Sequence, residues 1–446
     1  MKRPQDEHSP GVPDEARQGE ETPDQRDDRW SWVEPAIWTD RMIIALDRGV
    51  KGGKWFSLMD KVGAERTLRV AWERVKRNRG AAGVDRQSTD AFAAHAERYL
   101  AELAADLRSG QYRPQPVRRV WIEKPGRREK RPLGIPTVKD RVVQTALKLV
   151  CEPIFEAGFA EQSYGFRPGR GCKDALRRVE ALLQSGAVFV VDADIAHYFD
   201  AIPRDRLLAC VQQRIADGRV VALITSYLSQ GVMEGTEQWE PEAGTPQGAV
   251  ISPLLANIYL DPLDHLMAQS GWEMVRYADD FVVLCRSQDE AEDALGALHE
   301  WVEAQGLTLH PDKTRIVDAR EPGGFDFLGY HFERGMRWPK RESVKSFRQA
   351  IRAKTGRSSG GSMTAIIASI NPIIRGWYSY YRHGHWTTYG PLDGYVRGRL
   401  RSILRKRMGK KGRGRGSDHR RWPNAYFDAH GLFTMIAARR AAGYSR

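Results

Sequence analysis

Apolar residues at intervals of three and four predict a series of helices along the chain. In TLRVAWERVKRNR (67–79), Leu68, Trp72 and Val75 would share one face of such a helix. The turn-forming segment GAAGVD (80–85) would end it. Further helices are predicted over about 90–109, 141–155 and 292–306, and from near Ser252.

Short runs rich in β-branched and aromatic residues predict strands between these helices. They are VRRVWI (117–122), VFVVDADI (188–195), TRIVDA (314–319) and FDFLGYHF (325–332). In MVRYADDFVVLC (274–285), two apolar runs flank Asp279 and Asp280, which predicts a β-hairpin with acidic residues at its tip. The mixture of strands and helices indicates an α/β or α+β core.

The two ends of the chain differ in composition from this core. Residues 1–29 are polar and poor in aliphatic side chains, which is typical of a disordered tail. The pattern breaks again near 340–363, a basic segment that ends in Gly and Ser, and residues 363–384 then predict a helix. We therefore expect a mixed core over residues 30–340 and a helical domain over residues 341–446.

The charge of the chain indicates the class of its partner. Seventy Lys and Arg against 57 Asp and Glu give a net charge of +13, which favours a polyanion such as nucleic acid, although basic surfaces also serve membranes or solubility. No apolar run reaches the roughly 18 residues of a membrane span, and the first 28 residues show no signal-peptide pattern. We expect no membrane association and a cytoplasmic location. The four cysteines form no C-x-x-C pair, which argues against structural zinc and a disulfide framework.

The candidate chemistry lies in acidic residues at the ends of predicted strands. Two adjacent carboxylates in an apolar setting, Asp279 and Asp280, are costly to bury unless a cation compensates them. Two divalent ions about 3.5–4 Å apart do so in nucleotidyl transfer, with further oxygen ligands from another strand. Asp194 is the candidate on that strand, favoured by its spacing to Phe199, and Asp192 competes with it on the same face. The alternative is a solvated Asp-Asp turn.

Eight sequence blocks occur in an order and spacing that carry a resemblance. They are GAAGVD (80–85), KRPLGIPTVKDRVVQ (130–144), SYGFRPGRGCKDAL (163–176), DADIAHYFDAIP (192–203), GTPQGAVISPLLANIYL (244–260), RYADDFVVLC (276–285), GLTLHPDKT (306–314) and FDFLGY (325–330). The series resembles the bacterial group II intron reverse transcriptase/maturase family over nearly the whole chain from about residue 38. The resemblance implies an α+β right-hand polymerase, with fingers and palm over 30–340 and a helical thumb, or maturase domain, over 341–446.

This resemblance implies RNA-directed DNA synthesis by two-metal nucleotidyl transfer, with intron RNA binding that assists splicing and retrohoming. The implied partners are an RNA template, intron RNA, a DNA primer or target, and dNTPs. Some relatives append a zinc-bearing HNH nuclease with paired cysteines, which we do not expect here. A domesticated reverse transcriptase in DNA repair or phage defence, and a non-catalytic RNA-binding maturase, are the alternatives.

The resemblance also implies roles for single residues around the nucleotide. Asp194, Asp279 and Asp280 are similar to the aspartates that bind two Mg²⁺ ions, for which Mn²⁺ substitutes. The other implied contacts are Lys124 and Arg131 on the triphosphate, Phe199 under the sugar to select dNTPs, Gln247 beside the nascent base pair, and Lys313 near the phosphates. Several of these roles have an alternative. Lys124 and Arg131 could belong to an ordinary solvated turn. Phe199 could be a buried core residue, and Lys313 could be a surface lysine.

Several cations and aromatic residues are candidates for RNA contact. In SYGFRPGRG, Tyr164 and Arg167 combine an aromatic ring with a cation, which suits template bases and backbone. The segment 397–421 holds many cations and a single acid, a pattern that suits phosphates but also occurs on solvated surfaces. The candidates in the helical domain are Arg375, Arg382, Arg405, Lys406 and Arg407.

Overall fold

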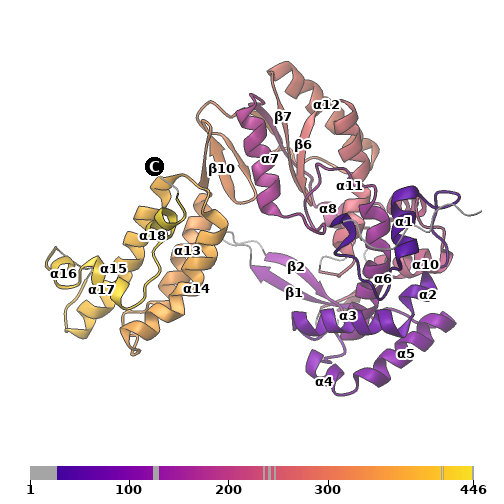
Figure 1. The fold of residues 1–446 in the computed structure, drawn as a ribbon, viewed down its shortest axis with the longest axis horizontal. Helices are drawn as coiled ribbons and strands as arrows, with labels where there is room; N and C mark the ends of the chain where they lie inside the picture. The colour runs from indigo at the N-terminus through magenta and orange to yellow at the C-terminus, as the bar shows by residue number, and fades with distance from the viewer. Residues whose placement is uncertain are drawn as a thin grey trace, which may run out of the picture.

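A computed structural model describes residues 28–123, 130–234, 237–239, 243–245, 248–412, 414 and 416–443. Figure 1 shows a larger body of strands and helices and, at one side of it, a group of C-terminal helices. The predicted α+β class is confirmed, because helices pack on sheets whose strands pair mainly antiparallel. The four cysteines are free thiols. Among the described residues, no helix has the length and apolarity needed to span a bilayer.

The chain before the first strand is helical. It forms η2 (Asp28–Trp30), α1 (Asp40–Arg48), α2 (Met59–Val62), α3 (Glu65–Asn78), α4 (Thr89–Ala93) and α5 (Ala96–Ser109). The prediction of one helix over 90–109 was wrong, because His95 leaves the helical conformation and separates α4 from α5. The break lets both pieces contact α3, and the Phe92 ring lies 4.5 Å from that of Trp72. Periodic spacing continues across the break and did not reveal it.

A first sheet of four strands has the order β2-β1-β4-β5. It consists of β1 (Val117–Glu123), β2 (Lys130–Ile135), β4 (Val232–Glu234) and β5 (Glu237–Trp239). β1 and β2 form an antiparallel hairpin that places Arg131 opposite Ile122. The long helix α6 (Val138–Glu156) follows and is buried over most of its length. The predicted strand over 117–122 and the predicted helix over 141–155 are confirmed.

A second sheet has the order β6-β7-β3-β8 and holds the acidic residues. Its strands are β3 (Phe189–Asp194), β6 (Glu273–Tyr277), β7 (Asp280–Cys285) and β8 (Arg315–Asp318). The remaining helices of this body are α7 (Cys172–Gln184), α8 (Tyr198–Ala201), α9 (Arg204–Gln212), α10 (Gly218–Leu228), α11 (Ser252–Gln269) and α12 (Gln288–Ala304). Alternate residues of β3 pack on opposite sides, with Val191 in the large core and Val190 in a second core that includes α7.

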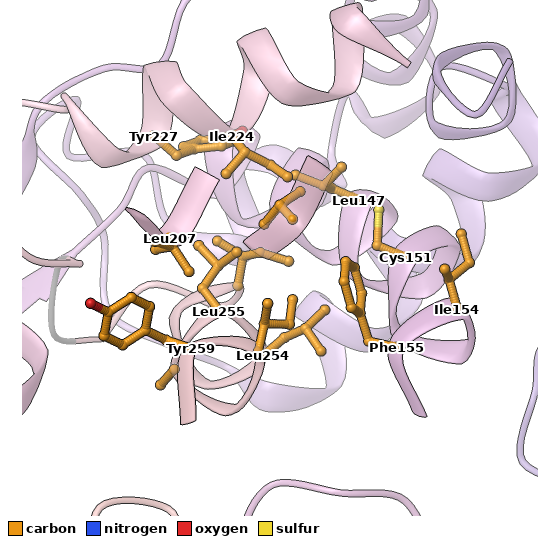
Figure 2. Close-up of a cluster of buried hydrophobic side chains, with 14 of the residues drawn as sticks. Leu147, Cys151, Ile154, Phe155, Leu207, Ile224, Tyr227, Leu254, Leu255 and Tyr259 are labelled. Carbon is orange, nitrogen blue, oxygen red and sulfur yellow. The ribbon is translucent and has the colours of Figure 1, made fainter. Parts of the chain in front are cut away.

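The large core fixes the second sheet relative to the helices. Figure 2 shows buried side chains packed together, among them Leu147 of α6, Leu207 of α9, Tyr227 of α10 and Leu254 of α11. These side chains are almost fully buried. Burying each large apolar side chain contributes roughly 1.5–3 kcal/mol, so this core is a rigid support for the strands that carry the acids.

A third sheet joins the body to the C-terminal helices, and its strands are β9 (Phe325–Phe327), β10 (Tyr330–Glu333) and β11 (Met336–Pro339). Sequence indicated a strand-like segment over 325–332, but the structure breaks it into two strands. Leu328 and Gly329, with φ of +46° and +80°, form a two-residue turn between them. Such a turn requires positive φ at both positions, which glycine supplies readily and leucine does not.

The C-terminal helices are α13 (Arg341–Lys354), α14 (Met363–Tyr381), η3 (Trp386–Thr388), α15 (Tyr389–Arg407), α16 (Gly416–Arg421), α17 (Asn424–Ala429) and α18 (Met435–Ala441). Their buried side chains form a core of their own. The predicted break near 340–363 was wrong for α13, because Phe347 and Ile351 give this charged segment a buried face. The helix predicted over 363–384 is confirmed as α14, which continues through Pro372.

Candidate active site

The three candidate aspartates occupy neighbouring backbone positions where β3 and β6 end and β7 begins. The antiparallel pairing of β3 with β7 places Asp194 directly opposite Asp280. β6 and β7 pair Tyr277 with Asp280, so that Ala278 and Asp279 form the two-residue turn between these strands. Ala278 has φ of +60°, which such a turn requires. Residues more than 80 positions apart in sequence are therefore neighbours.

The electrostatics of this cluster favour a bound cation. Desolvation by the surrounding protein, and then the Asp279 carboxylate, raise the pKa of Asp280 to about 7. Burial is the largest cause that raises the pKa of Asp279, and Asp194 raises it further. The Asp280 side chain is nevertheless exposed to solvent, so a cation can reach its carboxylate. Both shifts show that negative charge at this place is unfavourable without compensation.

Asp192 lies one same-face position further along the strands, where its charge still raises the pKa of Asp280. It lies opposite Val282 in β7, and its carboxylate is 3.5 Å from the Arg315 guanidinium of β8. The carboxylate of Asp194 is instead paired with the Lys313 ammonium. Between the two candidates on this face of β3, the geometry favours Asp194 as the partner of the 278–279 turn.

The donor set fits Mg²⁺ in its chemistry, since all three side chains offer hard oxygen ligands. In the described part of the chain, no three His, Cys, Asp or Glu side chains converge as a ready-made metal site. Magnesium is commonly bound by one or two carboxylates together with waters and substrate phosphates, so a complete protein cage is not required.

A buried network beneath the turn was missed by the sequence reasoning. The Arg276 guanidinium of β6 is fully buried and donates to both carboxylate oxygens of Asp264 on α11. It also donates to the Asn257 side-chain oxygen and to the Ala278 carbonyl, each at 2.9 Å. Arg276 therefore ties the turn to α11. The only sequence signal was a charged residue inside an otherwise apolar strand.

The residues expected around the nucleotide have different outcomes. Arg131 is exposed on β2 and lies close enough to Asp279 to lower the pKa of that carboxyl. Phe199 is half-buried on α8, with its ring 5.4 Å from that of Tyr198, and its carbonyl accepts from Thr245 N–H at 2.7 Å. Lys124 and Gln247 lie outside the described residues.

The template contact expected for Arg167 is not supported. Its guanidinium is buried, donates to both carboxylate oxygens of Glu156, and donates to the Ser163 carbonyl at 2.9 Å. Arg167 therefore holds the 160–167 loop against α6. Tyr164 remains half-buried, and its backbone N–H donates to the Arg276 carbonyl at 2.8 Å.

The cations of the helical domain divide into exposed and internal ones. Arg375, Lys406 and Arg407 are exposed, whereas Arg382 is half-buried. The RNA contact predicted for Arg405 is not supported, because its guanidinium is largely buried and lies 2.6 Å from the Asp418 carboxylate. It is committed to an internal ion pair between α15 and α16.

Comparisons with known proteins match both parts of the chain. Residues 122–332 match the family described as "Reverse transcriptase (RNA-dependent DNA polymerase)", and residues 344–422 match "Group II intron, maturase-specific domain". The group II intron-encoded protein LtrA of Lactococcus lactis is 38% identical over 202 residues, 45% of this chain and 33% of that protein. Protein YkfC of Escherichia coli is 32% identical over 329 residues, 64% of this chain and 84% of that protein. The chain thus spans most of the second relative and about a third of the first.

Proposed function

Because the chain belongs to the group II intron reverse transcriptase/maturase family, we propose that it is an RNA-directed DNA polymerase that copies RNA by nucleotidyl transfer. The observation that supports this most directly is the pairing of Asp194 with Asp280, next to Asp279 in the turn. A protein that only binds RNA gains nothing from three acids gathered at such an electrostatic cost.

The proposal assigns each candidate residue a part in nucleotidyl transfer. Asp194, Asp279 and Asp280 would hold two Mg²⁺ ions, or Mn²⁺ in their place, and the bound ions would supply stabilisation of charge on the attacking and leaving oxygens. Arg131 on the β1–β2 hairpin binds the triphosphate, and Lys124 is its expected companion. Gln247 contacts the nascent base pair.

The helical domain supplies the RNA-binding surface in this proposal. We propose the division into fingers and palm over residues 30–340 and thumb over residues 341–446, supported by the separate core of the C-terminal helices. Intron RNA bound there would assist splicing and retrohoming, while the RNA template and the DNA primer or target occupy the palm. The net charge of +13 supports binding of such polyanions.

Primer extension tests the proposal. Purified protein with an annealed RNA template and DNA primer should incorporate dNTPs in Mg²⁺, stop on chelation with EDTA, and resume when Mg²⁺ or Mn²⁺ is restored. Absence of extension by protein that still binds RNA would favour the non-catalytic maturase.

Phe199→Ala is expected to relax discrimination between dNTPs and rNTPs. A smaller side chain leaves room for a ribose 2′-hydroxyl, and steric discrimination of this kind changes by roughly tenfold or more. The measurement is the ratio of kcat/KM values for a dNTP and its rNTP. An equal decrease in kcat/KM for both nucleotides, together with a lower Tm, would instead identify Phe199 as a core residue.

Replacing exposed thumb cations should weaken RNA binding without affecting folding. For Arg375→Ala and Lys406→Ala, we expect lower affinity for RNA, and a salt dependence of log K reduced by roughly one for each phosphate that the variant no longer binds. Arg405→Ala is the comparison, because it removes an ion pair to the buried Asp418 carboxylate and should lower thermal stability. An unchanged salt dependence in both exposed variants would contradict the assignment.

A further inference from the structure

Helix α14 of the thumb is hydrogen-bonded to the turn between β9 and β10. The Tyr380 hydroxyl donates to the Leu328 carbonyl at 2.7 Å, and the Tyr330 hydroxyl donates to the Tyr380 carbonyl at 2.7 Å. The two tyrosine rings lie 6.0 Å apart. Figure 1 shows β10 between the C-terminal helices and the body that carries the aspartates. These bonds connect two parts of the molecule with separate cores.

The same turn reaches the acidic cluster. The Leu328 backbone amide lies close enough to the Asp280 carboxyl to lower the pKa of that group, and β9, which precedes this turn, contacts β7. Leu328 has φ of +46°, a conformation that a leucine seldom adopts unless neighbouring contacts hold it. The Leu328 carbonyl accepts the hydrogen bond from the Tyr380 hydroxyl. One residue of the turn therefore links a thumb hydroxyl to a proposed metal ligand.

A thiol forms a second contact between the thumb and the cluster. Cys172, in the first turn of α7, lies close enough to the Tyr277 and Tyr380 hydroxyls to raise the pKa of both. Tyr277 is the β6 residue that pairs with Asp280 across the hairpin. Tyr380 is thus connected to both sides of the turn at which the aspartates meet.

We propose that Tyr380 is a positioning residue of the polymerase site, whose hydroxyl fixes the Leu328 turn so that the Asp280 carboxylate is oriented for its metal ion. This inference rests on the proposed function. With Tyr380 in this role, the metal site is complete only when α14 is docked on the third sheet. Residues that orient a ligand through hydrogen bonds commonly change metal affinity by tenfold or more when they are replaced.

Tyr380→Phe removes the hydroxyl and keeps the ring. Binding of Mn²⁺ to the full-length protein, followed by electron paramagnetic resonance, should weaken by about tenfold, and kcat for dNTP addition should fall by a similar factor. KM for the dNTP, the Kd for RNA and Tm should change little, because the ring still packs against Tyr330.

Two matched variants make the test specific. Tyr395→Phe removes a hydroxyl that donates to the Arg348 carbonyl at 3.0 Å inside the thumb, and should behave like the wild type. Tyr330→Phe removes the reciprocal docking bond but leaves the Leu328 contact, so its Mn²⁺ affinity should stay near that of the wild type.

Two outcomes overturn the inference. One is Mn²⁺ binding and kcat of Tyr380→Phe equal to those of the wild type. The other is equal losses in Tyr380→Phe and Tyr330→Phe, which would assign the effect to docking of α14 in general. A wild-type protein that neither binds Mn²⁺ nor extends primers would refute the proposed function itself, and is therefore a distinguishable result.

Discussion

Replacing Asp279 and Asp280 together with alanine is expected to abolish DNA synthesis, with dNTP incorporation reduced by a factor on the order of a thousand or more. Bound metal ions supply several kcal/mol of transition-state stabilisation, and each 1.36 kcal/mol corresponds to about tenfold in rate. RNA binding should stay near the wild-type level, because the exposed cations of the C-terminal helices are unaffected. Single-nucleotide incorporation and RNA affinity, measured side by side, check this.

The double variant should also be at least as stable as the wild type when metal is chelated. A carboxyl whose folded pKa is raised favours the folded state at low pH, and that contribution is lost as pH rises through the folded value. For Asp280 the loss runs from its usual pKa of about 4 up to about 7. Near pH 8 in EDTA, removing the charge should therefore preserve or raise Tm, and stabilisation by added Mg²⁺ should disappear.

Asp192→Ala is the matched control for this prediction. It removes an acid from the same face of β3, two residues before Asp194, and leaves the 278–279 turn intact. We expect its effect on synthesis to be no more than a few-fold. A nearly inactive Asp192→Ala together with a fully active Asp194→Ala would show that the cluster is misassigned.

The acidic site was predictable because its residues follow strong local patterns. Apolar runs around Asp279 and Asp280 indicated a hairpin, and β-branched residues before Asp194 indicated a strand. The structure shows both. That these strands are neighbours followed from the family resemblance, since periodicity does not specify which strands pair.

What the sequence did not reveal depends on contacts between distant segments. Arg167 and Arg405 are cations of the kind that bind RNA, yet each forms an ion pair with an acid on another element. Conversely, Tyr380 lies in a helix that apolar spacing identifies only as a packing element. A local pattern reports the class of a side chain, whereas its partner is fixed by packing.

The second large effect is expected at the buried ion pair beneath the 278–279 turn. Asp264→Ala leaves the Arg276 guanidinium buried without its carboxylate partner, which should lower the free energy of unfolding by about 3–5 kcal/mol. Urea denaturation followed by circular dichroism measures this loss. Arg69→Ala removes an exposed pair with Glu97 and should cost less than about 1 kcal/mol.

A double replacement separates stability from positioning at the same place. Arg276→Met with Asp264→Leu exchanges the ion pair for apolar side chains of similar size, a change that is often neutral or stabilising. It nevertheless removes the donor that holds the Ala278 carbonyl and with it the orientation of Asp279. We therefore expect a well-folded protein whose kcat is lower by about a hundredfold while the KM for dNTP changes little. If this stable double variant kept the kcat of the wild type, the turn would be held by the strands alone, and Arg276 would serve only the fold.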